Sequence, residues 1–587
     1  MLLPTLAALV ATLAVGSSEG DISDCATTNK TILDAPCQGY DCLLQYVQKD
    51  DGMFSWTDTG LRLNGTNDAV LPKNKKSWTG YVLNVTSQAW LTPQDFNFTP
   101  FGGVPRGHIW WHILVVIIPS NRRPSADQSF LYMTGGTNSP GPTGGVPDAS
   151  SEDITVVSSV AMGTGLVGAT LFQTPNQHMV FAADPLQKHR SEDAVIAFTW
   201  KRFVQDPTRV EWPLRLPMTK GGVKAMDAVQ LFMKAHDGTV INSFAVAGAS
   251  KRGWTTWTVG AVDPRVFTIV PIVMDELNFI QNIHHHFKAY GGWSFALNDY
   301  TELNFTRCLD HPNTAALMGI VDPINYADRY RPGLPKLVIN SGMDEFLMPD
   351  NTRFWWDRMP EPKRFLMIPN AEHSEVTGIL EILPDLATFL NRVVDSAGGS
   401  PAQQAASIPQ FAQFRDSASG DITVVVDEGA LPAGVALESV HVWHATTCNA
   451  ERRDFRVVSL GWGPGGTSCL PCLGVKVKGL CPNLKVLWSK EALNETAPGT
   501  GTYVAHRDVP SGGRWTAFFV DVQFSSGTDG AEEEGEEDGE RELLTPQQLG
   551  WPVLGKQTFE FTSEVSVIPD TYPFADCAGE SCAGHLV

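Results

Sequence analysis

Basic residues are scarce in this sequence. Its 587 residues include 43 Lys and Arg against 64 Asp and Glu, a formal net charge of -21 at pH 7. Nucleic acids and anionic membrane surfaces bind basic surfaces, so this balance argues against both as partners. Part of the acidic excess is local: residues 528–545 are rich in Glu and Gly, and we expect a disordered acidic loop there.

Long hydrophobic runs are also few. Apart from the N-terminus, the strongest run is at residues 109–119, which is too short to cross a bilayer and contains His112. Residues 1–20 carry an apolar stretch at 6–15 followed by small residues, which is typical of a secretory signal peptide, although no Lys or Arg precedes it. We therefore expect an exported, extracellular protein without a membrane span.

Patterns that bind metals or cofactors are missing as well. His284, His285 and His286 are adjacent, so on a helix they point in different directions and lack the i, i+4 spacing of paired ligands. Cys469 and Cys472 have the spacing of a redox motif or half a zinc site, but Gly- and Pro-rich sequence surrounds them. We expect no metal and no cofactor.

The ten cysteines are an even number and fall into clusters, which in an exported chain favours up to five structural disulfides. Export also agrees with six N-x-S/T triplets, the acceptor pattern for N-glycosylation. The acceptors are Asn29, Asn64, Asn84, Asn97, Asn304 and Asn494.

The chain is too long for one ordinary core, so we expect more than one domain. Residues 21–105 are polar and rich in N-x-S/T, and we interpret them as a glycosylated N-terminal region that wraps the next domain or forms a lid. Residues 106–396 alternate strand-like and helix-like runs, which predicts an α/β domain with a mostly parallel, doubly wound sheet. Residues 397–410 are typical of a linker, and residues 411–587 predict an all-β, sandwich-like domain.

Residues 277–332 interrupt the α/β alternation between two predicted strands. Such an insertion follows the carboxyl end of a strand, where parallel sheets bind ligands, so we expect it to cap the active site. The strands are predicted at 109–118, 129–134, 167–174, 244–249, 266–274, 336–340 and 364–369, and the helices at 152–163, 226–236 and 254–261.

The stretch around Ser250 has the form of a nucleophile elbow. An apolar run ends at Ala249, Ser250 occupies the turn, and a helix-compatible segment follows. Gly248 and Gly253 relieve crowding around a serine held in a strained backbone conformation. The spacing is G-x-S-x-x-G instead of the commoner G-x-S-x-G, which predicts that Arg252 points away from the packed side.

An α/β-hydrolase carries its catalytic groups in the chain order serine, acid, histidine, each just after a strand. Asp344 follows the strand predicted at 336–340, and His373 follows the one predicted at 364–369. We expect Ser250 to attack an acyl carbon, His373 to transfer the proton, and Asp344 to hold the imidazole. The rival acids are Glu345, Asp350 and Asp275.

The same chemistry needs two backbone N–H groups that stabilise the developing oxyanion. Lys251, directly after the nucleophile, is expected to supply one. Gly135 and Gly136, in the loop after the strand at 129–134, are expected to supply the other. The expected substrate is an acyl, peptide or glycan ester compound.

The strings LYMTGGTN, GASKRGWTTW, INSGMDEFLMPDN and IPNAEHS resemble the PhoPQ-activated pathogenicity-related protein family, over roughly residues 80 to 580. The resemblance implies an α/β-hydrolase fold, with Ser250, Asp344 and His373 at the catalytic positions. The family includes a secreted autocrine proliferation repressor of social amoebae, which implies an extracellular signal and a cell-surface receptor as a partner.

Three functions remain open from the sequence. The first is a secreted serine hydrolase that cleaves an ester or peptide bond. The second is an extracellular signalling protein on a hydrolase scaffold in which catalysis is dispensable. The third is a carbohydrate esterase, because the G-x-S-[KR]-x-G spacing is similar to that of glucuronoyl esterases, where the residue matching Lys251 borders the oxyanion hole.

Overall fold

The computed structural model describes residues 25–66, 75–97, 107–124, 126–138, 145–396, 401–460, 480–482, 486–526 and 558–587. The predicted signal peptide, the acidic loop at 528–545 and the pair Cys469 and Cys472 lie outside these residues. Within the described ranges, no helix combines the length and hydropathy that a bilayer crossing requires.

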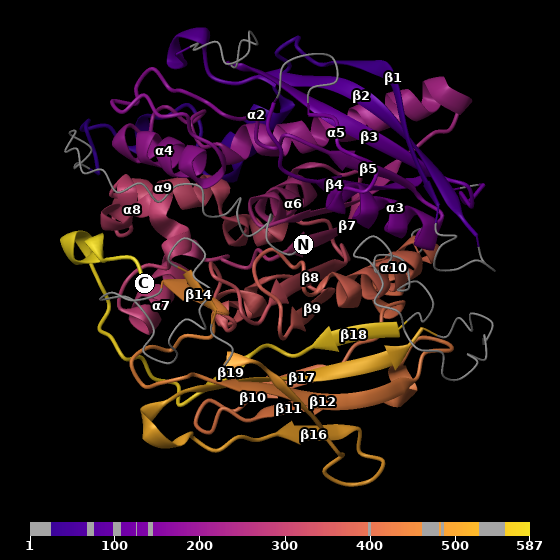
Figure 1. Ribbon diagram of the computed structural model, residues 1–587, viewed down its shortest axis with the longest axis vertical. Helices are drawn as coiled ribbons and strands as arrows, with labels where there is room; N and C mark the ends of the chain where they lie inside the picture. Colours follow the sequence, from indigo (N-terminus) through magenta and orange to yellow (C-terminus); the bar gives the residue numbers. More distant parts are fainter. Residues whose placement is uncertain are drawn as a thin grey trace.

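A nine-stranded sheet forms the centre of the molecule (Figure 1). Its spatial order is β1-β2-β3-β5-β4-β6-β7-β8-β9, with parallel pairing from β5 to β9 and antiparallel pairing among β1, β2, β3 and β5. The α/β unit built on this mixed, mostly parallel sheet has the α/β-hydrolase fold, as the sequence predicts. Its strands are β1 (Ser55–Thr66), β2 (Ser77–Ala89), β3 (Ile109–Pro119), β4 (Gln128–Met133), β5 (Val167–Leu171), β6 (Ser243–Ala249), β7 (Val266–Ile272), β8 (Lys336–Ser341) and β9 (Lys363–Ile368).

Strands β1 and β2 lie in the region that the sequence analysis interprets as an N-terminal wrap or lid. They instead extend the central sheet, because β2 pairs with β3 along its whole length and buries Trp78 and Val82. The sequence did not indicate them because β2 mixes Gly, Asn, Ser and Gln with its apolar residues, and β1 is largely exposed. The sheet therefore begins well before Ile109.

Helices cover both faces of the sheet. α3 and α10 pack together on one face, while α2, α5 and α6 pack together on the other. The helices before the insertion are α2 (Tyr40–Gln48), α3 (Glu152–Thr164), α4 (Glu192–Gln205), α5 (Arg215–Asp237) and α6 (Lys251–Val262), and α10 (Ile379–Asp395) follows β9.

The insertion between β7 and β8 is helical. It contains α7 (Phe279–Tyr290), α8 (Asn298–Glu302) and α9 (Pro312–Val321), joined by short 3-10 turns. α8 and α9 both pack against α4, so the insertion and α4 lie over the same face of the sheet.

The C-terminal part forms two small antiparallel sheets below the α/β unit (Figure 1). The first has the order β10-β11-β16, the second β15-β12-β17-β18, and β19 also pairs with β17. A further pair joins β13 and β14. The strands are β10 (Ala412–Arg415), β11 (Ile422–Val425), β12 (Leu437–Thr446), β13 (Val458–Leu460), β14 (Leu480–Pro482), β15 (Ser489–Ala492), β16 (Thr502–Ala505), β17 (Thr516–Ser525), β18 (Thr558–Thr562) and β19 (Ser566–Ile568).

Residues 401–410 of the segment predicted as a linker lie against the α/β unit. It includes a short helix, α11 (Pro401–Ala406), and Arg364 of β9 donates a hydrogen bond to the Pro409 carbonyl at 2.8 Å. The side chains of Ile408 and Val424 belong to the same core cluster as Phe389 of α10. The β domain therefore shares a core with the α/β unit, because the short linker brings its strands directly onto α10 and β9.

Buried carboxyl groups lie at this shared boundary. Asp385 of α10 accepts the N–H of Glu560 in β18 at 2.7 Å and is 2% exposed. Burial raises the pKa of Asp385 well above its usual range, and the charges of Glu381 and Asp521 raise it further. Burial raises the pKa of Glu560 in the same way, with Lys490 as the nearby cation that opposes the shift. The folded protein thus holds protons here that the unfolded chain releases.

We predict that the stability of this boundary falls as pH rises. A carboxyl with a raised folded pKa stabilises fully below its unfolded pKa near 4, and the contribution is lost as pH rises through the folded pKa, by about 1.4 kcal/mol per pH unit. Asp385→Asn keeps the acceptor for Glu560 and removes this ionisation. Urea unfolding should therefore show the variant more stable than wild type at pH 8 and similar at pH 4.

A matched control is Glu428→Gln, since Glu428 is exposed and its replacement should leave the pH dependence between pH 4 and pH 8 unchanged. Equal pH slopes for wild type and Asp385→Asn would contradict the assignment.

Candidate active site

Ser250 lies in the tight turn between β6 and α6. Its φ and ψ are 57° and -124°, a conformation that costs on the order of 1–3 kcal/mol for a residue with a side chain. Close packing enforces the turn. A Cβ at Gly248 would lie 2.8 Å from the Arg252 side chain, and one at Gly253 would lie 2.6 Å from Met274. Both glycines are required, as the sequence predicts.

Three side chains from separate loops meet at the carboxyl edge of the sheet. Ser250 Oγ lies 2.8 Å from His373 Nε2, and His373 Nδ1 lies 2.7 Å from Asp344 Oδ2. Ser250 follows β6, Asp344 follows β8, and His373 follows β9. The structure brings these three residues into one hydrogen-bonded chain.

The turn that carries Asp344 holds its carboxylate in place. Oδ1 accepts hydrogen bonds from the N–H groups of Phe346 at 2.6 Å and Leu347 at 2.9 Å, which leaves Oδ2 to face His373. The Phe346 ring packs against the imidazole with centroids 4.4 Å apart. An imidazole that donates from Nδ1 presents an unprotonated Nε2, here toward the hydroxyl of Ser250.

Asp350, one of the rival acids, has other partners. It lies 2.6 Å from the Arg453 guanidinium and 2.9 Å from His285. Burial alone would raise the pKa of Asp350, but the charges of Arg453 and His285 hold it well below its usual range. Asp350 therefore joins the insertion to the β domain.

The other two rivals also lie away from the imidazole nitrogens. Glu345 accepts the backbone N–H of His373 at 3.1 Å, and burial, followed by the charge of Asp344, raises its pKa to about 7. Asp275 is buried beside Asn351, and burial raises its pKa well above its usual range. Neither carboxyl occupies the place of Asp344.

The loop after β4 lies against the elbow, since β4 and β6 are parallel neighbours. A Cβ at Gly135 would lie 2.7 Å from the Arg252 guanidinium, so a larger residue there would displace that side chain. Gly136 has φ 114°, which glycine adopts readily. Lys251 is the first residue of α6, where N–H groups lack partners within the helix.

The two basic residues after Ser250 are paired. Lys251 Nζ lies 3.1 Å from Glu192 and 2.9 Å from Asp193, and Arg252 lies 2.6 Å from Glu192. Burial would raise the pKa of Glu192, but Arg252 and Lys251 lower it. The prediction that Arg252 points away from the packed side is wrong, because Glu192 offers it a buried partner. Glu192 and Asp193 were not predicted as site residues, because their signal in the sequence is only an acidic pair at the start of a helix.

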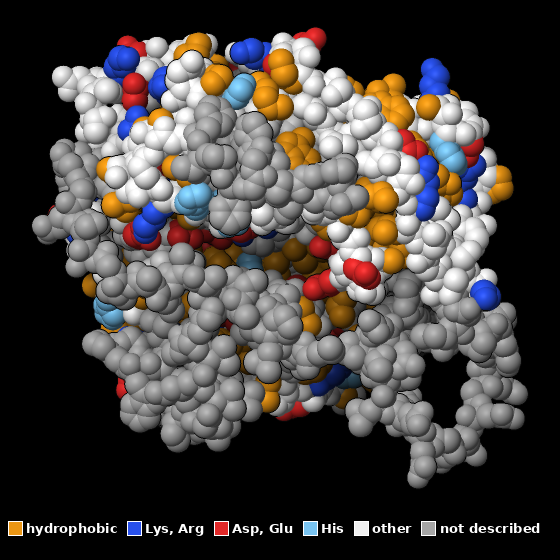
Figure 2. All heavy atoms as spheres, turned by 45° about the horizontal axis from the view of Figure 1, so that its top comes forward, with side chains coloured by type: hydrophobic (Ala, Val, Ile, Leu, Met, Phe, Trp, Pro, Cys, Tyr) orange, Lys and Arg blue, Asp and Glu red, His pale blue; other side chains and the backbone are white. Residues whose placement is uncertain are grey.

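A cavity lies beside Ser250 and His373. The insertion, α4 and α6 supply its wall, so the insertion contributes to the cavity as expected. In the space-filling view, one face of the molecule is hollowed, and hydrophobic and acidic side chains lie in the hollow (Figure 2). The aromatic and charged residues of the wall are Trp200, Trp254, Phe279, Trp293, Tyr300, Phe305, Phe346, Asp193, Arg215, Lys251 and Glu276.

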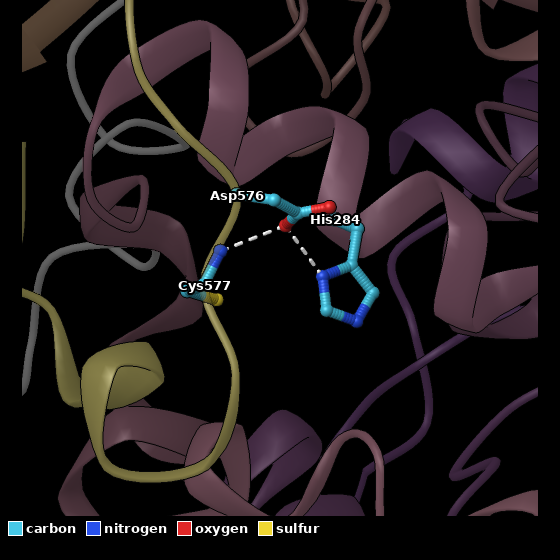
Figure 3. A group of neighbouring side chains, drawn as sticks. All are labelled: His284, Asp576 and Cys577. Atoms are coloured by element: carbon cyan, nitrogen blue, oxygen red, sulfur yellow. Dashed lines mark hydrogen bonds and ion pairs between the residues drawn. The ribbon is translucent and has the colours of Figure 1, made fainter.

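The histidine triplet has three different surroundings. His284 Nδ1 lies 2.7 Å from Asp576 and Nε2 lies 3.0 Å from Asp310. Cys577 is next to this ion pair (Figure 3), but its sulfur is bonded to Cys582 and is no thiolate ligand. The group around His284 is therefore an ion-pair network. His285 faces Asp350 and Tyr572, and His286 accepts the N–H of Ser294.

Disulfides join Cys25 to Cys308, Cys37 to Cys42 and Cys577 to Cys582, as the sequence predicts, and Cys448 is disulfide-bonded as well. The six acceptor asparagines differ in exposure. Asn84, in the middle of β2, and Asn304, in the insertion, are half-buried. The other four are exposed, namely Asn29, Asn64, Asn97 and Asn494.

Comparison with known proteins supports the family resemblance of the strings LYMTGGTN, GASKRGWTTW, INSGMDEFLMPDN and IPNAEHS. The family model for PhoPQ-activated pathogenicity-related proteins matches residues 43–456. The autocrine proliferation repressor protein A of Dictyostelium discoideum is 33% identical over 542 residues, which cover 92% of each chain.

Solved structures with a similar course of the chain include two acetyl xylan esterases. The one from a Thermoanaerobacterium species has a TM-score of 0.33 at 13% identity, covering 57% of this chain and 87% of that chain. The one from a Paenibacillus species has a TM-score of 0.35 at 11% identity, covering 60% and 97%. By the extent of the family match and the identity to the amoebal repressor, the chain belongs to the PhoPQ-activated pathogenicity-related protein family.

Proposed function

We propose that this protein is a secreted serine hydrolase that cleaves an ester or peptide bond. Ser250 is the nucleophile, His373 the general base and acid, and Asp344 the group that orients the imidazole. One observation carries the proposal: an unbroken chain of hydrogen bonds runs from Asp344 through His373 to Ser250 at a strained turn.

The reaction proceeds by acyl transfer. Ser250 Oγ attacks the carbonyl carbon while His373 Nε2 takes the hydroxyl proton, and Asp344 stabilises the imidazolium that forms. The imidazolium then protonates the leaving oxygen or nitrogen, and the acyl group stays on Ser250. Water, deprotonated by His373, then attacks the acyl carbon. The imidazolium returns the proton to Ser250 Oγ, which releases the acid and restores the serine.

The oxyanion of this reaction is held by backbone N–H groups. Lys251 supplies one at the N-terminus of α6, where the helix dipole adds favourable potential. The loop at Gly135 and Gly136 supplies the second, and its contact with Arg252 fixes it beside the elbow.

The charges of the cavity wall do not separate a uronate ester from other esters. The carboxyl of a uronate ester is esterified and carries no charge before cleavage. The wall holds Arg215 besides Lys251, whose charge is balanced by Glu192 and Asp193. The glucuronoyl-esterase alternative therefore stays open, together with neutral acyl and peptide substrates.

Export of the protein, with glycosylation at exposed acceptors, is part of the proposal. The disulfide Cys25–Cys308 joins the beginning of the described chain to the insertion, and such bonds persist in oxidising compartments. The signal-peptide pattern at 1–20 agrees with this.

A second candidate function is suggested by the name of the amoebal relative. In that alternative the protein represses proliferation by binding a cell-surface receptor, and hydrolysis is dispensable. The two candidates differ in what happens when Ser250 is removed.

We predict that a fluorophosphonate probe labels the folded protein at Ser250. Ser250→Ala should abolish labelling and lower ester turnover by several orders of magnitude, because the nucleophile is lost. Mass spectrometry of the labelled peptide locates the adduct. A folded protein that takes up no probe would contradict the hydrolase proposal, and full activity of Ser250→Ala on responding cells would favour the signalling candidate.

We predict that two neighbouring acids give opposite results. Asp344→Asn should lower kcat on the order of 10⁴-fold with little change in Tm, because it disturbs the imidazole tautomer. Asp350→Asn should leave kcat within a few-fold but destabilise the fold by about 3–5 kcal/mol, because Arg453 loses its buried partner. Turnover and thermal unfolding of both variants provide the test, and equal kcat values would refute the assignment of Asp344.

A further inference from the structure

The segment 576–587 returns from the β domain to the insertion. After β19 the chain runs upward beside α7 and α8, toward the end marked C (Figure 1). It is closed on itself by the disulfide Cys577–Cys582 and joined to α7 by the ion pair between Asp576 and His284 (Figure 3). This segment is far from Ser250 in the sequence, yet it touches the wall of the cavity.

The contact is made through Trp293. The Trp293 ring N–H donates to the Cys582 carbonyl at 2.9 Å, its backbone N–H donates to His585 at 2.9 Å, and its carbonyl accepts from Val587 at 2.7 Å. Trp293 is wholly buried and lines the cavity beside Ser250. The segment 576–587 thus fixes both the backbone and the ring of one wall residue.

We call these contacts of the segment 576–587 with Trp293 the clamp. The residues around the clamp are tightly packed. Gly584 has φ 56°, and a Cβ there would lie 2.7 Å from Trp293 Nε1. A Cβ at Gly292 would lie 2.5 Å from the His585 carbonyl. Arg456 of the β domain donates to the Val587 carbonyl at 3.0 Å, which ties the end of the segment to the core. These contacts hold the indole of Trp293 in the wall of the cavity.

The cavity that Trp293 lines is small, with a volume of about 50 Å³. A cavity of roughly 150 Å³ binds benzene, so this cavity takes a group clearly smaller than a benzene ring. Such a space takes a short substituent and excludes a long chain, a bulky side chain or a sugar.

We propose that this cavity receives the acyl group of the substrate and that the clamp on Trp293 limits that group to short chains of about two to four carbons. The acyl side is the one that fits, because the acyl group stays bonded to Ser250 while the leaving group must diffuse away. The substrate is then a short-chain ester whose alcohol part lies outside the cavity. This inference rests on the proposed hydrolase function.

The experiment measures kcat/KM for p-nitrophenyl acetate, butyrate, hexanoate and octanoate with the full-length protein. Wild type should prefer acetate or butyrate over octanoate by at least 100-fold. Trp293→Leu should raise the octanoate-to-acetate ratio by at least 10-fold, because the smaller side chain enlarges the cavity. A matched control is Trp90→Leu, since Trp90 is equally buried but lines no part of this cavity, and its ratio should stay at the wild-type value.

The outcomes separate the two proposals. Hydrolysis of every ester with no preference for short chains would overturn the acyl-pocket inference and leave the hydrolase intact, even if no variant folds. An unchanged ratio in folded Trp293→Leu would overturn the role of the clamp. Absence of all turnover, together with absence of fluorophosphonate labelling at Ser250, would overturn both proposals. A series of acetate esters with longer alcohols should show little dependence on alcohol length, and a steep dependence would place the leaving group in the cavity instead.

Discussion

The hydrogen bond between His373 and Asp344 requires that the two loops carrying these residues keep their relative position. The β domain contacts both loops. Trp488 donates its ring N–H to the Gly342 carbonyl at 3.3 Å, on the loop of Asp344. Its backbone N–H donates to the Asn370 side chain at 2.8 Å, on the loop of His373. A single residue of the second domain thus bridges the two loops, and the β domain is part of the scaffold of the site.

The cores explain why the two domains act together. Successive residues of one buried strand serve opposite faces: Val338 packs on the side of α5 and α6, while Leu337 and Ile339 pack on the side of α3 and α10. The second core continues without a break into Val440 and Phe518 of the β domain. Because no separate core marks the boundary, loss of the β domain would expose the face of the sheet that carries α10.

Local patterns predicted those parts of the site that lie within one continuous stretch of sequence. The elbow at Ser250 and the positions of Asp344 and His373 after two strands follow from apolar runs that end in turns. The pairing of Lys251 with Glu192 could not be predicted, because it joins α4 and α6, which are separated in the sequence by α5 and β6.

The edge of the sheet and the wall of the cavity could not be predicted from local patterns either. β2 carries many polar residues because one of its faces is only partly covered, so its pattern resembles a loop. The contact of Trp293 with Cys582 spans 289 positions of sequence and rests on backbone carbonyls, which leave no mark on residue type. Carboxyl groups that stay neutral when buried are likewise invisible in composition.

The energetic cost of the site bears on which function it serves. Ser250 holds an unfavourable φ, and burial raises the pKa values of Glu345, Glu375 and Asp275, so these groups destabilise the fold as pH rises through their folded pKa values. A surface used only to bind a receptor needs neither the strained serine nor an imidazole aligned with it. A hydrolase needs both, because the strained turn presents the hydroxyl and the aligned imidazole takes its proton. Hydrolysis and signalling are compatible in such a protein, since an enzyme that cleaves an extracellular ester or peptide alters what neighbouring cells receive.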